Sequence, residues 1–111
     1  MSVGWGQDCI DGVEVELWGE CYNIVETTEL DLSESGLTGE IPLEIGNLIN
    51  LTALDLGYNN LTGEIPLEIG NLTNLSSLGL YNNQLSGEIP SEIGDFTYLL
   101  YLNLSGNQLI G

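Results

Sequence analysis

The carboxylates are the residues of this chain that could do chemistry. Its 111 residues include 17 Asp and Glu side chains and no Lys, Arg or His, which gives a formal net charge of −17. Two carboxylates at a defined separation can hydrolyse a glycosidic bond, and several oxygen ligands together can bind Ca²⁺. With so many acids, however, some pair always meets that separation, and the sequence offers neither His nor Lys as a base. We therefore expect no enzyme activity.

The same composition excludes two classes of partner. Binding to nucleic acid or to an anionic membrane requires cationic side chains that neutralise phosphate, and this sequence has none. No stretch approaches the length of an apolar transmembrane span. The first residues, MSVGWGQD, have neither the charged nor the apolar region of a signal peptide, so we expect no signal peptide in this sequence.

The acids recur at a fixed spacing. If successive units stack as strands of a sheet, glutamates that repeat in every unit would form columns with neighbours about 5 Å apart. A solvated surface is the simpler interpretation of such columns. Binding of Ca²⁺ between them stays open, although the sequence contains no EF-hand loop. The two series are Glu40, Glu64, Glu88 and Glu44, Glu68, Glu92.

The elements that must position these residues follow the same 24-residue period. Leu54 and Leu56 alternate with polar residues, which predicts a short strand with both leucines pointing inward. An asparagine follows where the chain must bend, and a buried amide can satisfy backbone groups in a tight turn. Stacked one per coil, these residues would form an asparagine ladder. Its members are Asn59, Asn83 and Asn107.

The second half of each unit begins with GEIP and continues as a short apolar segment. Its prolines, Pro42, Pro66 and Pro90, are the only three in the chain. The segment after each proline is too short for a stable α-helix and contains a glycine. We therefore expect a single 3-10 turn that directs one isoleucine of each unit to the core.

The full pattern, LxxLxLxxNxLxGxIPxxIGxL, resembles the plant-specific class of leucine-rich repeat. The resemblance covers residues 30–111, as three full 24-residue units and a truncated fourth. It implies a repeat solenoid of the α/β class, mostly β with 3-10 turns. In such a solenoid a curved coil carries a parallel sheet on its concave face and a short second sheet on its flank. The resemblance also implies a binding function in an extracellular protein.

Residues 1–29 lack the repeat and are expected to cap the first coil. The segment VEVELW (13–18) alternates, which predicts a half-buried strand with Val13, Val15 and Leu17 on one side. A turn at Asp11–Gly12 would lead into it.

Both cysteines lie in this segment. The stretch WGECYNIVETTELDLS resembles the capping segment that precedes plant-type repeats, and a small secreted domain often needs a covalent staple. We therefore expect a disulfide between Cys9 and Cys21. The alternative is a pair of free, buried thiols in a cytosolic protein. Without His or a CxxC pair we expect no metal site and no cofactor.

The variable positions of the predicted concave strands are the usual recognition surface of a solenoid. Here they are acidic at one end and aromatic and polar at the other. Tyrosines supply contact area with a polar tip, which suits a protein partner, and a carbohydrate is possible. The alternative is a set of scattered surface tyrosines without a partner. The candidate face comprises Asp31, Glu34, Asp55, Tyr58, Tyr81, Asn82, Tyr101 and Asn103.

The truncated fourth unit should leave an apolar coil edge exposed. A homodimer that joins two such edges would bury both. The candidate self-association end comprises Leu99, Leu102, Leu104, Leu109 and Ile110.

These observations predict a non-catalytic, protein-binding module of an extracellular protein. The alternative is a structural or self-assembling segment of a longer surface or adhesion array. Ice binding through the regular series Thr38, Thr62 and Ser86 is a third hypothesis, which the serine weakens.

Overall fold

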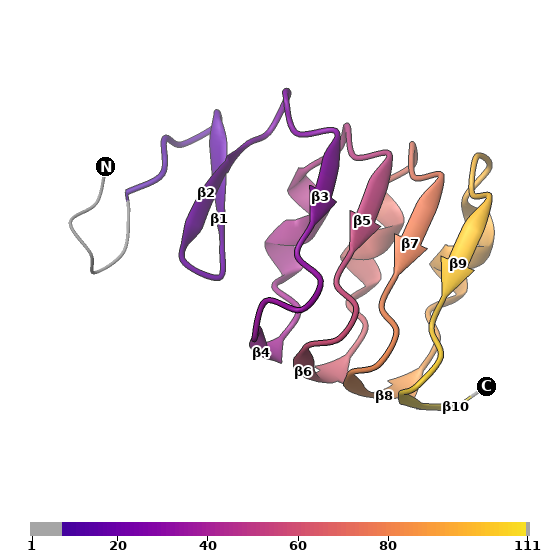
Figure 1. Ribbon diagram of the computed structural model, residues 1–111. Coiled ribbons are helices and arrows are strands. Elements are labelled where there is room, and N and C mark those ends of the chain that lie inside the picture. Colours follow the sequence, from indigo (N-terminus) through magenta and orange to yellow (C-terminus); the bar gives the residue numbers. More distant parts are fainter. Residues whose placement is uncertain (1–7, 111) are drawn as a thin grey trace.

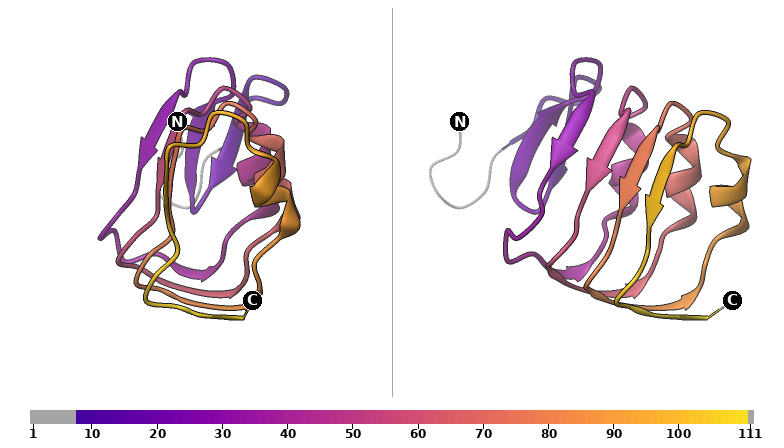
Figure 2. Two further views of the ribbon diagram at one scale, coloured as in Figure 1. Left: turned by 90° about the vertical axis from the view of Figure 1, so that its right-hand side faces the viewer. Right: turned by 45° about the vertical axis from the view of Figure 1, so that its right-hand side comes forward.

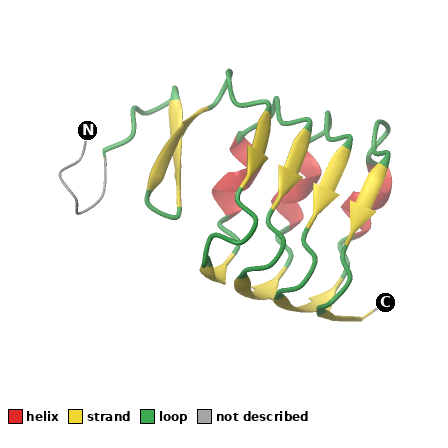
Figure 3. Ribbon diagram, viewed as in Figure 1, coloured by secondary structure: helices red, strands yellow, loops and turns green. Residues whose placement is uncertain are grey.

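The described chain winds into coils that stack side by side, with a hairpin at its N-terminal end (Figure 1). The computed structural model describes residues 8–110, so residues 1–7 of the expected cap lie outside the described residues, as does most of the stretch considered for a signal peptide. Each coil contributes a strand to a front sheet and a strand to a second sheet, and 3-10 turns lie behind the front sheet (Figures 2 and 3). The predicted solenoid is confirmed.

The front sheet is parallel and stacks equivalent residues of successive units. Its Cα partners are 24 positions apart, so that Leu54 lies between Leu30 and Leu78. Leu54 and Leu78 are 1% and 0% exposed, which confirms the inward alternation. We call this the concave sheet. Its strands are β3 (Glu29–Asp31), β5 (Ala53–Asp55), β7 (Ser77–Gly79) and β9 (Tyr101–Asn103).

The second sheet, on the flank, follows a different register. Glu40 pairs with Thr62, and Glu64 pairs with Ser86, so that partners are 22 positions apart. Glu40, Glu64 and Glu88 therefore do not form the column predicted at the strand spacing, because equivalent glutamates of this sheet are displaced diagonally from coil to coil. The strands of this flank sheet are β4 (Thr38–Glu40), β6 (Asn60–Glu64), β8 (Gln84–Glu88) and β10 (Gln108–Ile110).

A glycine in each of three flank strands, β4, β6 and β8, accommodates this displaced register. Gly63 has φ of +78°, a left-handed conformation that favours glycine. The side chain of Glu40 also crosses directly over it, because a Cβ on Gly63 would lie 2.8 Å from Glu40 Cγ. Gly87 receives Glu64 in the same way, at 2.8 Å. The repeated glycine therefore has two roles. It allows the left-handed bend of its own coil, and it leaves space for the glutamate side chain of the coil before it.

Short 3-10 turns follow the prolines on the side opposite the concave sheet. They are η1 (Leu43–Asn47), η2 (Leu67–Asn71) and η3 (Ser91–Asp95). Ile45 and Ile69 are 0% exposed and Ile93 is 6% exposed, which confirms the expected inward isoleucines. In the described part of the chain, no helix is long and apolar enough to span a bilayer.

The N-terminal segment forms an antiparallel hairpin of β1 (Glu14–Leu17) and β2 (Glu20–Asn23) that packs beside η1. Val15 and Leu17 are buried and join the core of the solenoid. The expectation for Val13 is wrong: this residue is 46% exposed, because the turn that contains Asp11 and Gly12 continues through Val13 and the strand begins only afterwards.

A disulfide joins Cys9 to Cys21, as expected. It ties the segment before β1 to strand β2 and so fixes the entry to the hairpin. Glu14 lies close to both sulfurs. Because those sulfurs are bonded to each other, they are not available as thiolate ligands for a metal ion.

Asn59 joins its own coil to the coil before it. Its Nδ2 donates to the carbonyl oxygens of Leu32, 3.0 Å away in the preceding coil, and Leu56, 2.9 Å away in its own. Its Oδ1 accepts from the backbone N–H groups of Ser35 and Leu37, both at 3.0 Å. One buried amide therefore satisfies two turns at once.

Asn83 and Asn107 repeat this arrangement one and two coils later. Asn83 donates to the carbonyl of Leu56 at 3.0 Å and accepts from the N–H of Leu61. Asn107 donates to the carbonyl of Leu80 at 2.8 Å. Ser35, at the same position in the first coil, is exposed, and its Oγ donates only to Ser33 of its own turn.

The substitution Asn59→Ala tests how much the hydrogen bonds of the Asn59 side chain contribute to the free energy of unfolding. It leaves the N–H groups of Ser35 and Leu37 without their acceptor, so we expect the free energy of unfolding to fall by about 2–4 kcal/mol in a urea titration. Asn60→Ala is the matched control, because the exposed Asn60 side chain makes no hydrogen bond among the described residues, and it should change stability by less than about 0.5 kcal/mol. Equal effects of the two substitutions would contradict a special role for Asn59.

Candidate functional site

The concave sheet presents four residues of three types along one row of its outer surface. Asp31, Asp55, Gly79 and Asn103 are paired in register across β3, β5, β7 and β9. They alternate along their strands with the inward leucines, so they face away from the core. The row is acidic over the first two strands and has no charge over the last two.

Tyr81 lies across this surface in a space left by two glycines. A Cβ on Gly57 would collide with its ring, and a Cβ on Gly79 would lie 2.9 Å from its Cε1 atom. The hydroxyl of Tyr81 donates a 3.0 Å hydrogen bond to Oδ2 of Asp55. The ring is therefore held flat against the sheet by the space beneath it and by a charged partner at its tip.

Tyr58 meets this ring edge-on. The two ring centroids are 5.3 Å apart and the planes are inclined by 89°, a favourable T-shaped arrangement. Tyr58 has φ of +56°, which is unusual for a bulky residue. The equivalent residues of the next two coils, Asn82 and Gly106, are types that tolerate this conformation, whereas Glu34 of the preceding coil adopts it at φ of +53°. The aromatic residue therefore imposes a strain of about 1 kcal/mol or more on its coil.

The two aspartates are oriented by local hydrogen bonds. Oδ1 of Asp31 accepts from the N–H of Ser33 at 3.0 Å and from its hydroxyl at 2.7 Å. These bonds hold the pKa of the Asp31 carboxyl below its ordinary value. Oδ1 of Asp55 accepts from the N–H of Gly57 at 2.9 Å, which leaves Oδ2 for Tyr81.

These contacts bring together part of the predicted face. Tyr101 lies on β9, where its hydroxyl accepts a 3.1 Å hydrogen bond from Asn103 Nδ2. Glu34 is exposed in the bend after β3, and Asn82 lines a shallow hollow beside the asparagine ladder. The glycines beneath Tyr81 were missed by the sequence analysis, although two glycines in neighbouring coils at outward positions are a detectable signal. We use the name tyrosine–aspartate cluster for Asp31, Asp55, Tyr58 and Tyr81.

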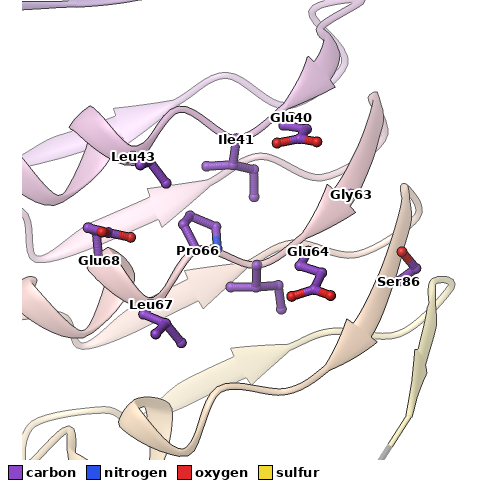
Figure 4. A pocket seen from close by; sticks show the side chains of 10 residues that line it. Glu40, Ile41, Leu43, Gly63, Glu64, Pro66, Leu67, Glu68 and Ser86 are labelled. Atoms are coloured by element: carbon purple, nitrogen blue, oxygen red, sulfur yellow. The ribbon is translucent and has the colours of Figure 1, made fainter.

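A groove on the flank is a second feature that the sequence analysis missed. It is a hollow of about 650 Å³ lined by Glu40 and Glu64 at one end and by the apolar side chains of Leu43 and Leu67 at the other (Figure 4). A similar groove recurs one coil later, lined by Glu64, Glu88 and Ile89. The groove is therefore a product of stacking that recurs from one coil to the next.

The candidate self-association end is more exposed than the equivalent residues of inner coils. Leu102 is 42% exposed, whereas Leu78 and Leu54 are 0% and 1% exposed. Ile110 is 62% exposed. Leu99, Leu104 and Leu109 are partly buried against the core.

Comparison with known proteins gives a consistent family assignment. The sequence model of the family described as Leucine Rich Repeat matches three times, at residues 26–48, 50–72 and 74–96. No curated protein gives a significant match.

Solved structures of plant proteins are similar to the chain. The BIR2 ectodomain from Arabidopsis thaliana is 37% identical with a TM-score of 0.69, and the match covers 82% of this chain and 45% of that one. The plant peptide hormone receptor RGFR1 in complex with RGF2 is 40% identical with a TM-score of 0.67, over 84% of this chain and 17% of that one. A plant ice-binding protein is 40% identical with a TM-score of 0.64, over 66% of this chain and 24% of that one. The chain thus spans less than half the length of each.

Titration of the tyrosine hydroxyls tests the environment of Tyr81. Partial burial, followed by the hydrogen bond to Asp55, raises the pKa of Tyr81 to about 12 from 10.0. In an ultraviolet titration of the five tyrosines, Tyr81→Phe should remove the last step, and Asp55→Asn should move it to lower pH. The folded state holds the proton of the Tyr81 hydroxyl more tightly than the unfolded state does. The stability that the protonated hydroxyl contributes is therefore fully present below pH 10 and is lost as the pH rises through about 12.

Tyr98→Phe is the control for that titration, because Tyr98 is 64% exposed and lies outside the concave sheet. It should leave the last step in place. A last step that survives in the Tyr81→Phe variant would assign that step to another tyrosine and contradict the raised pKa of Tyr81.

Proposed function

Because this chain belongs to the leucine-rich repeat family, with repeats of the plant type, we propose that it is a non-catalytic module that binds a protein or peptide on its concave sheet. The observation that carries the proposal is the contrast between the two kinds of position in each coil. The inward leucines, the ladder asparagines and the GEIP residues repeat, whereas the outward residues of the concave sheet differ from coil to coil. A surface whose side chains vary on a constant scaffold is suited to recognition.

The similar structures support this class of function and an extracellular location. One is an ectodomain and another is a peptide hormone receptor in complex with its hormone. The disulfide between Cys9 and Cys21 is the kind of bond that persists in an oxidising compartment. Carbohydrate is a second possible ligand class, because exposed tyrosines such as Tyr58 and Tyr101 also suit sugar rings.

An immobilised array of random peptides, with a glycan array beside it, tests the proposal. We expect a subset of peptides to retain the chain, and Tyr101→Ser to weaken that binding by about fivefold or more, since exposed aromatic residues carry much of the energy of an interface. Tyr98→Ser is the matched control, because it removes an exposed tyrosine outside the concave sheet. It should leave peptide binding unchanged.

Two results of the array experiment would count against the proposal. Equal losses in the two variants would place binding outside the concave sheet. Retention by glycans alone would replace a protein partner with a carbohydrate.

We also infer a second function, self-association through the C-terminal coil, which the exposure of Leu102 and Ile110 favours. This inference fits the alternative of a structural segment in a longer array, where the same face would contact a further coil. The 111-residue chain should show a dimer mass by light scattering at high concentration, and added salt should strengthen the dimer by screening the charge of −17.

Leu102→Asn should return the mass to that of a monomer. Leu67→Asn is the control, because Leu67 is 60% exposed but lies on the flank. A monomer mass for the unmodified chain at every concentration and salt level would contradict self-association.

Ice binding is a function that one similar structure names, but the register does not favour it here. Thr38 pairs with Asn60, and Thr62 pairs with Gln84, so the expected hydroxyl column is interrupted by other side chains. We therefore do not propose it.

A further inference from the structure

We propose that the tyrosine–aspartate cluster binds an arginine side chain presented by a basic peptide segment. This inference rests on the proposed function, because it names the chemistry of the partner that the concave sheet would bind. The cluster combines two carboxylates on adjacent strands with two aromatic rings that are already held in place.

The carboxylates carry the first part of the argument. Asp31 and Asp55 are direct neighbours in the sheet, so their side chains leave the same face about 5 Å apart. The sequence supplies no Lys, Arg or His that could neutralise them. Oδ2 of Asp31 accepts no hydrogen bond from the residues that the structure describes, and Oδ2 of Asp55 accepts only one. A cationic donor from outside would therefore find free acceptors on both.

The aromatic rings carry the second part. The ring of Tyr81 is fixed by Asp55 and by the space above Gly57 and Gly79, and Tyr58 meets it at 89°. Cations are attracted to the faces of such rings, and a planar guanidinium can stack on a ring while its N–H groups reach a carboxylate. Because the rings and carboxylates are already positioned, a partner would lose little free energy in ordering them.

The backbone of Tyr58 adopts a left-handed conformation that every coil uses at this position. Glu34 of the preceding coil adopts it at φ of +53° and Tyr58 at +56°, whereas Asn82 and Gly106 of the next two coils are residue types that suit it. A strained residue that contributes nothing to the core is expected where its side chain makes a needed contact. Tyr58 is 54% exposed, so that contact lies on the surface.

Charge complementarity selects the occupant among the candidates. The charge of −17 attracts cationic segments and repels acidic ones over the whole surface. A neutral sugar would leave the carboxylate pair without a counter-charge. Ca²⁺ prefers six to eight oxygen ligands and gains nothing from the two rings. Arginine makes use of both the rings and the carboxylates.

Binding can be measured by amide NMR spectra of the chain during titration with a capped peptide of glycine and serine that carries one arginine. Two further peptides carry lysine or uncharged citrulline in its place. We expect the affinity to decrease in the order arginine, lysine, citrulline. The largest spectral shifts should fall on β3, β5 and β7.

Two charge variants distinguish a local site from attraction to the whole acidic surface. Asp31→Asn should weaken binding of the arginine peptide by about tenfold, as expected for the loss of a charge-assisted hydrogen bond. Glu44→Gln removes the same charge from the exposed 3-10 turn of the same coil, behind the concave sheet, and should change affinity by less than about twofold. Equal losses in the two variants would overturn the proposal.

The variant Tyr58→Asn separates a role of the Tyr58 ring in binding from a role in stability. Because asparagine tolerates the left-handed conformation, this variant should unfold at the same or higher urea concentration, yet it should bind the arginine peptide several-fold more weakly. Unchanged affinity would overturn the role of the ring. Binding of array peptides on the concave sheet without preference for arginine would overturn this inference and leave the proposed function intact, whereas no peptide binding at all would overturn both.

Discussion

The stacking of coils depends on the asparagine amide that follows each concave strand after the first. Its oxygen accepts backbone N–H groups of the coil before it, and its nitrogen donates to carbonyls of both coils, as Asn59 does for Ser35 and Leu32. A tight bend in a coil of this size would otherwise leave several polar groups without partners in an apolar interior. The leucines supply the burial that drives stacking, but they would tolerate a sliding of one coil on the next. The amides do not, because each has donors and acceptors at fixed positions.

One sequence period therefore produces two registers. On the concave sheet, where the strands enter the ladder, residues 24 apart are paired, as Leu54 and Leu78 are. Beyond the ladder the chain turns, and the flank strands pair residues 22 apart, as Glu40 and Thr62 do. This difference separates carboxylates that a simple stack would align, which lessens the repulsion in a chain without any cationic side chain. The glycine under each glutamate, such as Gly63, is part of the same arrangement.

The sequence was sufficient to predict the features that depend on periodicity. The inward leucines and the 3-10 turns after the prolines follow from which residues recur, whereas the parallel sheet followed from the resemblance to plant-type repeats and the disulfide of Cys9 from a resemblance in the cap. The flank register could not be predicted, because it depends on how far the chain advances through the bend and not on residue type. Val13 was misassigned for a similar reason, since alternation does not show where a turn ends. The position of the Tyr81 ring over Gly57 and Gly79 could not be predicted either. It depends on the direction in which one side chain crosses a neighbouring coil, and the residue pattern of a single strand does not give that direction.

The repeat itself indicates where to look for function. A feature present in every coil, such as the flank groove, is explained by stacking alone. The informative positions are those where the sequence departs from the repeat at an energetic disadvantage. Tyr58, like Glu34 in the coil before it, adopts a conformation better suited to the residue types of the next two coils, and Gly57 and Gly79 give up side chains on an outward face where the other coils place polar groups. These departures converge on one ring, that of Tyr81, and on the carboxylate that holds it. Independent departures that meet at one surface patch are difficult to explain by stacking, and recognition on the concave sheet accounts for all of them.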